Sequence, residues 1–183
     1  MKEKITFRIN YKKAIETIVW LANKKPGIDI YHIAKVLYYA EKTHLNRYGR
    51  PIIGDTYIRM SYGQVPSGVR DLITKNSWLD ENDLEYFSSS LVVDKKTNHK
   101  LSALRKPKLK YFSETDIECL EEALKKYSDV SFNELKEICH KEKSWYSTAS
   151  NEPIDYMLMV DEDNPNKKEI IEEIQLTSQY VVF

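Results

Sequence analysis

Side chains that could perform acid–base or nucleophilic chemistry are scattered along this sequence. Its four histidines, His32, His44, His99 and His140, are far apart, and none belongs to an HExxH motif or accompanies a GxSxG nucleophile elbow. The best hydrolase arrangement would bring His44 next to Asp55 or Ser67 in space. A solitary histidine on a helix is more often a hydrogen-bonded structural residue. The sequence therefore predicts a protein that is not an enzyme, with no catalytic residue and no cofactor, and a hydrolase is the weakest alternative.

Most of the glycines occur in one stretch, YGRPIIGDTYIRMSYGQVPSG, residues 48–68, which holds four of the five glycines and two of the six prolines. Glycines can bring backbone N–H groups close to a phosphate at a helix N-terminus. The spacings here match neither GxGxxG nor GxxxxGK[ST], and the glycines fall at the edges of expected elements. We therefore expect structural turns at Gly49, Pro51, Gly54 and Gly63.

Acidic and sulfur-containing side chains give no pattern of metal ligands. The segment 161–172 has carboxylates at positions 1, 3 and 12 of an EF-hand count, but Pro165 and Asn166 stand where a ligand and the obligatory glycine are required. Cys119 and Cys139 have no neighbour at ligand spacing and are expected to be reduced, buried thiols. The sequence predicts no metal site.

Charge is balanced over the whole chain but distributed unevenly along it. Residues 1–50 carry 11 Lys and Arg against 4 Asp and Glu, whereas residues 101–183 carry 11 against 17. Attraction between these two parts within the fold is the favoured explanation, and a charged partner is the alternative.

Two features permit nucleic-acid binding. The basic run Arg105–Lys110 is expected to be a solvated strand end, because it lacks the interleaved aromatic residues of single-strand binders. The first two expected helices also permit a helix-turn-helix, although the second carries mostly core residues where short polar ones would reach base edges. DNA binding therefore stays open as an alternative.

Periodicity and capping residues predict mostly helices. They are expected over 11–24, between Asp29 and Gly49, from Pro66–Ser67 through Ile73, after capping boxes at Ser113 and Ser131, around Trp145, and over 165–179. One strand is expected over 56–62, and two more over 84–93 and 100–106 are joined by a polar turn, with 78–83 as a loop. The predicted fold class is α+β, mainly α-helical: one domain, residues 1–183, with six to seven helices and a small antiparallel β-sheet.

The sequence gives no sign of a membrane segment. The N-terminus, MKEKITFRIN, lacks an apolar core, and runs such as 156–160 are too short to span a bilayer. We expect a cytoplasmic protein without a membrane partner.

Tyrosines gather around the glycine-rich stretch: Tyr38, Tyr39, Tyr48, Tyr57 and Tyr62. Tyrosine offers a large contact area at small entropic cost and keeps a polar tip, as a protein-binding surface requires. An ordinary aromatic core explains the same pattern equally well.

One long segment resembles a known family. VLYYAEKTHLNRYGRPIIGDTYIRMSYGQVPSGVRDLI, residues 36–73, is similar to the SocA-like Panacea antitoxin domain, in which a helix with an aromatic triplet leads to a histidine, a G-[RK]-P step, a strand and YGPVP. Residues 138–159 resemble the family's later segment, with His140 and Trp145 at the matching places. Gln64 stands where the family usually has the first proline of YGPVP.

The resemblance implies an antitoxin, of a family with phage-associated (GepA-like) members, that neutralises its cognate protein toxin by direct binding. The alternatives are a DNA-binding regulator of its own promoter and an adaptor that delivers the toxin to a protease. The candidate toxin-binding platform, around residues 44–68, comprises His44, Arg50, Asp55, Tyr57, Tyr62, Gln64, Val65 and Pro66. The turns at Gly49, Pro51, Gly54 and Gly63 would hold this platform rigid.

The C-terminal residues Gln179–Phe183, QYVVF, are apolar. Such an end packs on its own domain or pairs with the strand edge of a partner.

Overall fold

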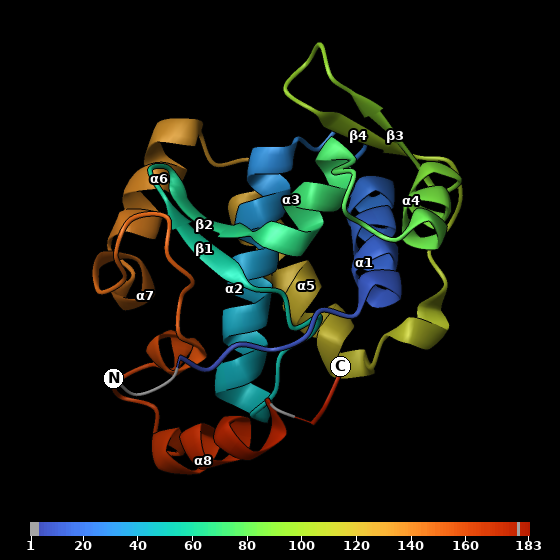
Figure 1. Ribbon diagram of the computed structural model, residues 1–183. Coiled ribbons are helices and arrows are strands. Elements are labelled where there is room, and N and C mark those ends of the chain that lie inside the picture. The colour runs from blue at the N-terminus through green and yellow to red at the C-terminus, as the bar shows by residue number, and fades with distance from the viewer. Residues whose placement is uncertain (1–3, 179) are drawn as a thin grey trace.

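Helices dominate the computed structural model, which describes residues 4–178 and 180–183 (Figure 1). Those residues form eight α-helices, two short 3-10 helices and two antiparallel two-stranded sheets. The α+β, mainly helical fold class is confirmed. In chain order the elements are α1 Tyr11–Lys24, α2 Ile30–Tyr48, β1 Tyr57–Met60, β2 Gly63–Pro66, α3 Ser67–Thr74, α4 Glu81–Ser88, β3 Leu91–Asp94, β4 Lys100–Ala103, η1 Leu109–Tyr111, α5 Glu114–Tyr127, α6 Phe132–His140, α7 Lys143–Tyr146, η2 Tyr156–Met159 and α8 Lys167–Thr177.

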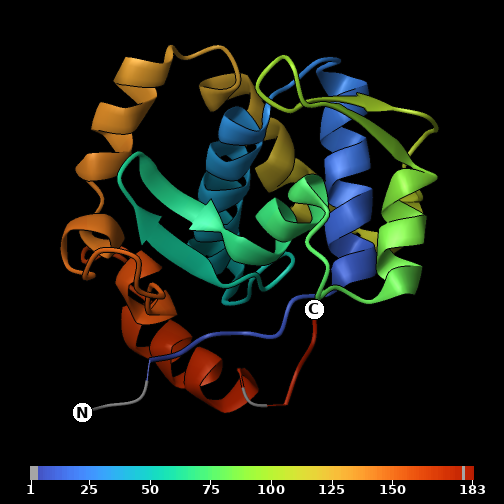
Figure 2. The same cartoon turned by 45° about the horizontal axis from the view of Figure 1, so that its top comes forward.

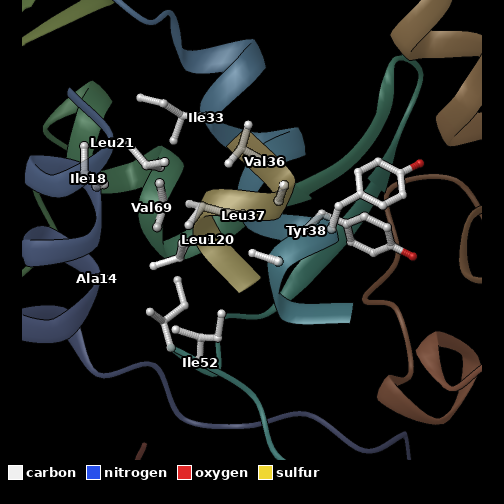
Figure 3. Close-up of a cluster of buried hydrophobic side chains, with 14 of the residues drawn as sticks. Ala14, Ile18, Leu21, Ile33, Val36, Leu37, Tyr38, Ile52, Val69 and Leu120 are labelled. Carbon is white, nitrogen blue, oxygen red and sulfur yellow. The ribbon is translucent and has the colours of Figure 1, made fainter. Parts of the chain in front are cut away.

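Helix α2 runs through the middle of the molecule and organises the core (Figure 1). Asp29 caps its first turn by accepting the His32 N–H, and Gly49 ends it in the left-handed conformation, as predicted. Figure 3 shows Ile18 of α1, Leu37 of α2, Val69 of α3 and Leu120 of α5 meeting in one cluster. Each such buried aliphatic side chain contributes about 1.5–3 kcal/mol of transfer free energy, so the core fixes where α2 presents its remaining faces.

The first hairpin, β1–β2, lies across α2 between α3 and α6 (Figure 2). Its register pairs Tyr57 with Pro66 and Met60 with Gly63, so Ser61 and Tyr62 form the turn. The prediction of one strand over 56–62 followed by a turn at Gly63 was therefore incomplete, because Gly63 begins the second strand. The other hairpin, β3–β4, is a separate sheet, so the expected single sheet is two.

Helix α4, Glu81–Ser88, lies where the sequence predicted a loop followed by a strand. Asp80 caps it by accepting the Asn82 N–H, and Glu81 and Asp83 lie in its first turn, where the helix dipole favours acidic residues. The loop prediction for 78–83 is confirmed only up to Asp80, and the strand prediction for 84–93 was wrong up to Ser88; only Leu91–Asp94 is strand.

Predicted caps define the C-terminal helices. Ser113 and Ser131 form complete capping boxes at α5 and α6, as expected. Helix α8 begins at Lys167, two residues after the predicted start, and the predicted end at Gln179 lies outside the described residues. Phe183 packs on the core edge, 5.7 Å from the Phe7 ring centroid.

Ion pairs explain the uneven charge distribution. Basic residues of the N-terminal helices contact acidic residues of the later part: Lys24 with Glu121 at 2.9 Å, Arg47 with Glu122 at 2.7 Å, and Lys42 with Glu142 at 2.6 Å. Both predicted thiols, Cys119 and Cys139, are buried and unbonded to each other. No described helix is long and apolar enough to cross a membrane.

Candidate partner-binding groove

A buried carboxylate holds the start of the glycine-rich connection. Glu41 of α2 accepts three successive backbone N–H groups, from Ile52, Ile53 and Gly54, at 2.8–3.2 Å, and the Tyr156 hydroxyl at 3.1 Å. Burial raises the pKa of Glu41, against the lowering effect of these bonds. The turn between α2 and β1 is thus fixed by a side chain that the sequence analysis did not single out.

Asp55 fastens the other end of the connection to α3. Its carboxylate oxygens each accept a backbone N–H at 2.9 Å, from Gly68 and Val69 in the first turn of that helix. Burial raises its pKa to about 7, and the nearby Glu41 adds to the rise. Asp55 is therefore an internal support of the hairpin.

Both outer edges of the β1–β2 hairpin are covered. On the β1 side, the Arg59 N–H donates to the Glu152 carbonyl, and the Asn151 N–H donates to the Arg59 carbonyl. On the β2 side, Lys35 Nζ of α2 donates to the Gln64 carbonyl at 2.7 Å. Unpaired strand edges can hydrogen-bond to a further strand. Because the edge groups named here are already bonded, no further strand can add to the hairpin at these positions.

The tip of the hairpin is held by the two residues of the later family-like segment. His140 Nε2 donates to the Ser61 carbonyl at 3.0 Å, and Trp145 Nε1 donates to the Met60 carbonyl at 2.9 Å. The two rings stack with centroids 3.7 Å apart, and the Arg59 guanidinium lies 4.2 Å from the Trp145 ring centroid. Residues far from the hairpin in sequence thus fix its turn.

An apolar groove opens beside this tip, with a volume of about 390 Å³. Its walls come from the first turns of α2, the β1–β2 hairpin, α3, the start of α6 and Asn98. Three aromatic rings form one side: Tyr31 and Phe132 have centroids 4.5 Å apart, and Tyr62 and Phe132 5.2 Å apart. Tyr62 is 56% exposed and Phe132 43% exposed. Large apolar groups left in contact with water beside a rigid turn are typical of binding surfaces. We call this hollow the aromatic groove.

The structure divides the predicted platform. Tyr62, Val65 and Pro66 line the aromatic groove. Tyr57 and Gln64 belong to the two strands of the hairpin and are fully buried, so the surface role predicted for them is corrected to an internal one. The remaining residues of the platform also lie elsewhere: His44, Arg50 and Asp55.

His44 and Arg50 lie at the opposite end of α2 from the groove. Thirteen residues at 1.5 Å rise separate Tyr31 from His44, about 20 Å. Arg50 donates to Ser113 Oγ and Asp116 Oδ1, both at 3.0 Å, and so ties the end of α2 to α5. A single platform over residues 44–68 was therefore too broad, because the rigid helix separates its two ends.

The hydrolase arrangement does not form. His44 Nδ1 donates to the Arg50 carbonyl at 2.9 Å, and Nε2 lies 3.0 Å from Thr115 Oγ1 and 3.2 Å from Asp116 Oδ1. Burial lowers the pKa of His44. Both ring nitrogens therefore have partners other than Asp55, and the Asp55 carboxylate bonds the first turn of α3.

The helix-turn-helix alternative is contradicted by the position of α2. Ile33–Ala40 are buried, and α5 packs along the helix. A recognition helix must lie in the major groove of DNA, and α2 lies inside the protein. The basic run is also partly engaged, because Arg105 pairs with the buried Glu16 at 2.6 Å.

Two neighbouring carboxylates at the start of the EF-hand-like segment bind lysines. Asp161 lies 2.9 Å from Lys42, and Glu162 pairs with Lys143 and Lys167. Across the described residues, no three His, Cys, Asp or Glu side chains gather as metal ligands would.

A family model described as "Antitoxin SocA-like, Panacea domain" matches residues 33–146, more than half of the chain. The chain belongs to this family. Comparisons with curated proteins and with solved structures give no match. The Panacea match runs from the first turn of α2 to the end of α7, so it contains Glu41, both residues that hold the hairpin tip, and all of the groove lining except Ile30 and Tyr31.

The groove has two aromatic residues that sequence reasoning missed. Tyr31 reads as part of the core face of α2, and Phe132 lies inside a capping box. They come together only when α6 packs beside the first turns of α2, with Tyr31 Oη 3.3 Å from the Phe132 carbonyl. The tyrosine-rich neighbourhood in the sequence pointed to Tyr62 but to neither of these two residues.

Proposed function

We propose that this Panacea protein is an antitoxin that neutralises a protein toxin by binding it directly through the aromatic groove. The observation that supports this most is the groove itself, where the exposed Tyr62 stands on a hairpin held at both edges and at its tip. Family membership supports the antitoxin role.

The geometry favours tight protein binding for two reasons. Aromatic side chains supply a large share of binding energy where a partner can desolvate them. A preformed surface also loses little conformational entropy on association. Backbone carbonyls of the tip are bound by His140 and Trp145, while the Tyr62 side chain stays exposed. The frame is therefore ordered before a partner arrives.

The first test is growth of a host that expresses the product of the adjacent gene, with and without this protein, coupled to co-purification. We expect growth rescue and a stable complex. Replacing Tyr62→Ala together with Pro66→Ala should weaken the complex by about 30-fold or more, because two groove residues are truncated. Calorimetry on the purified pair measures this change.

A matched control is Leu176→Ala on α8, a 69% exposed residue outside the groove lining, which should leave the affinity unchanged. Equal affinity of the double variant and the wild type would remove the groove assignment. An adaptor for a protease predicts instead that the toxin level falls in wild-type cells and recovers when the protease is absent. The proposal places both proteins in the cytoplasm.

A further inference from the structure

The charges that line the aromatic groove are all positive. Its described lining contains Lys35 and Arg70 and no carboxylate. Asn98, also in the lining, belongs to the turn that carries Lys95 and Lys96, and Lys100 begins β4 directly after this turn. In a hollow with low-dielectric walls, charges of one sign create a potential that water screens poorly.

Lys35 differs from the other buried cation of the described chain. Lys13 is 6% exposed and pairs with Asp116 at 2.9 Å. Lys35 is fully buried, and its only hydrogen-bond acceptor in the described structure is the Gln64 carbonyl. Burial lowers its pKa to about 8. An ammonium group can donate three hydrogen bonds, and a buried charge without a counter-ion is costly.

Arg70 brings a second positive charge to the mouth of the groove. It is 43% exposed as a side chain, and one terminal nitrogen lies 3.2 Å from Asp71 Oδ1. Among the described residues, the other terminal nitrogen has one hydrogen-bond acceptor, the Met60 sulfur at 3.9 Å. Guanidinium presents five N–H donors in a plane that matches a carboxylate, so Arg70 retains donors for a partner.

We propose that the groove binds a segment of the toxin in which a large apolar side chain stands next to Asp or Glu. The apolar side chain enters between the three aromatic rings of the groove and Val65. The carboxylate then pairs with Arg70, and the buried charge of Lys35 adds to the positive potential there. This inference rests on the proposed function, because it assigns the occupant of the same groove. Charge complementarity of this kind contributes mainly to specificity and association rate.

The test uses a display library of random 12-residue peptides selected on the full-length protein. We expect enriched sequences to place Trp, Phe, Leu or Met beside Asp or Glu. An enriched peptide is then compared, by fluorescence polarisation, with its twin in which Asn or Gln replaces the acidic residue. The twin should bind about tenfold more weakly. Amidation of the peptide's C-terminus should leave the affinity unchanged, because the effect is assigned to the side-chain carboxylate.

Protein variants locate the effect. Arg70→Gln should weaken the acidic peptide about tenfold and Lys35→Met about threefold, and neither should weaken the neutral twin. Lys110→Gln, an exposed lysine outside the groove lining, is the matched control and should bind like the wild type. A selection without acidic residues, or equal losses for both peptides, would overturn the inference.

The outcome is separable from that of the proposed function. If the wild type fails to rescue growth, the antitoxin assignment fails whatever peptides bind. If the wild type rescues growth and Arg70→Gln binds the toxin and the peptides like the wild type, the antitoxin assignment stands and the acidic-partner inference fails.

Discussion

The two hairpins of the described structure have strands of equal length but differ in how much of the surrounding protein contacts them. Each joins two antiparallel strands of four residues. Around β1–β2, Lys35, His140, Trp145 and residues 151–154 bond the backbone from both sides and at the tip. The β3–β4 hairpin projects from the helices (Figure 1), and its exposed turn is held by Asp94, which bonds the Lys96 N–H and the Thr97 hydroxyl.

The difference shows that tertiary contacts, more than strand pairing, decide which hairpin can present a fixed surface. A two-stranded hairpin alone is marginally stable in water. The β1–β2 hairpin gains order from elements that come before and after it in the chain. The β3–β4 hairpin is attached mainly along one side, where the Gly27 N–H donates to the Leu101 carbonyl and the Leu101 N–H donates to the Ile28 carbonyl.

The largest expected loss of stability comes from adding one methyl group at a glycine: Gly63 within the first hairpin, compared with Gly27 beside the second. Gly63 has φ +111°, and a Cβ there would lie 2.8 Å from Cys139 Cβ and 2.9 Å from Lys35 Nζ. Gly63→Ala should therefore lower the free energy of unfolding by about 3 kcal/mol or more, from backbone strain and overpacking. Gly27→Ala, at φ +78° with nothing within 4 Å, should lower it by about 1–2 kcal/mol from strain alone.

Urea unfolding of both variants measures the two losses. Equal losses would contradict the difference in packing on which the comparison rests. The wild type supplies the reference slope, because a change in slope would indicate a change in the unfolded or native ensemble.

A smaller change, an increase in the free energy of unfolding, is expected when Lys35 is replaced. Its pKa falls from 10.5 to about 8 on folding, so below pH 8 the folded chain bears the full cost of a buried charge, about 3 kcal/mol. Stability should rise between pH 8 and 10.5, where the unfolded chain still holds the proton that the folded chain has released. Lys35→Met should stabilise the protein at pH 7 by about 1–2 kcal/mol, after loss of the bond to Gln64.

Thermal or urea unfolding at pH 7 and at pH 10 measures this effect. The advantage of Lys35→Met should shrink at the higher pH, and Lys110→Met serves as the control with an exposed lysine. A variant less stable than the wild type at pH 7 would mean that the Gln64 bond outweighs the buried charge.

The smallest effect is expected in the turn of the second hairpin. Asp94→Ala removes bonds to the Lys96 N–H and the Thr97 hydroxyl, both solvent-exposed. The free energy of unfolding should fall by less than about 1 kcal/mol, as urea unfolding would measure. A loss as large as that of Gly63→Ala would show that this turn is coupled to the core.

Local signals in the sequence predicted the elements that local chemistry determines. The caps at Asp29, Gly49, Ser113 and Ser131 bond within a few residues of themselves, so their patterns are complete in the sequence. Strand β2 was missed because it contains Gly63 and Pro66, which usually end strands, and here its edge is completed by Lys35 from another helix.

The groove was predictable only in part, because some of its residues are brought together by contacts between distant parts of the chain. Tyr62, Val65 and Pro66 follow from a compact motif, whereas Tyr31 and Phe132 meet across about 100 residues of chain. Asp55 and Gln64 were assigned to the platform from the family resemblance, which does not show whether a side chain is exposed. They are buried since each bonds backbone groups that the fold encloses.

At the hairpin tip, the residues that hold the backbone in place are different from the residues whose side chains are available to a partner. His140 and Trp145 hold backbone carbonyls, which every amino acid possesses, while the rings that face outward belong to Tyr31, Tyr62 and Phe132. Substitutions at the outward positions leave the anchoring bonds in place. The scaffold can therefore acquire new partners by surface divergence alone, and a library randomised at these three positions is a rational starting point for redirecting its specificity.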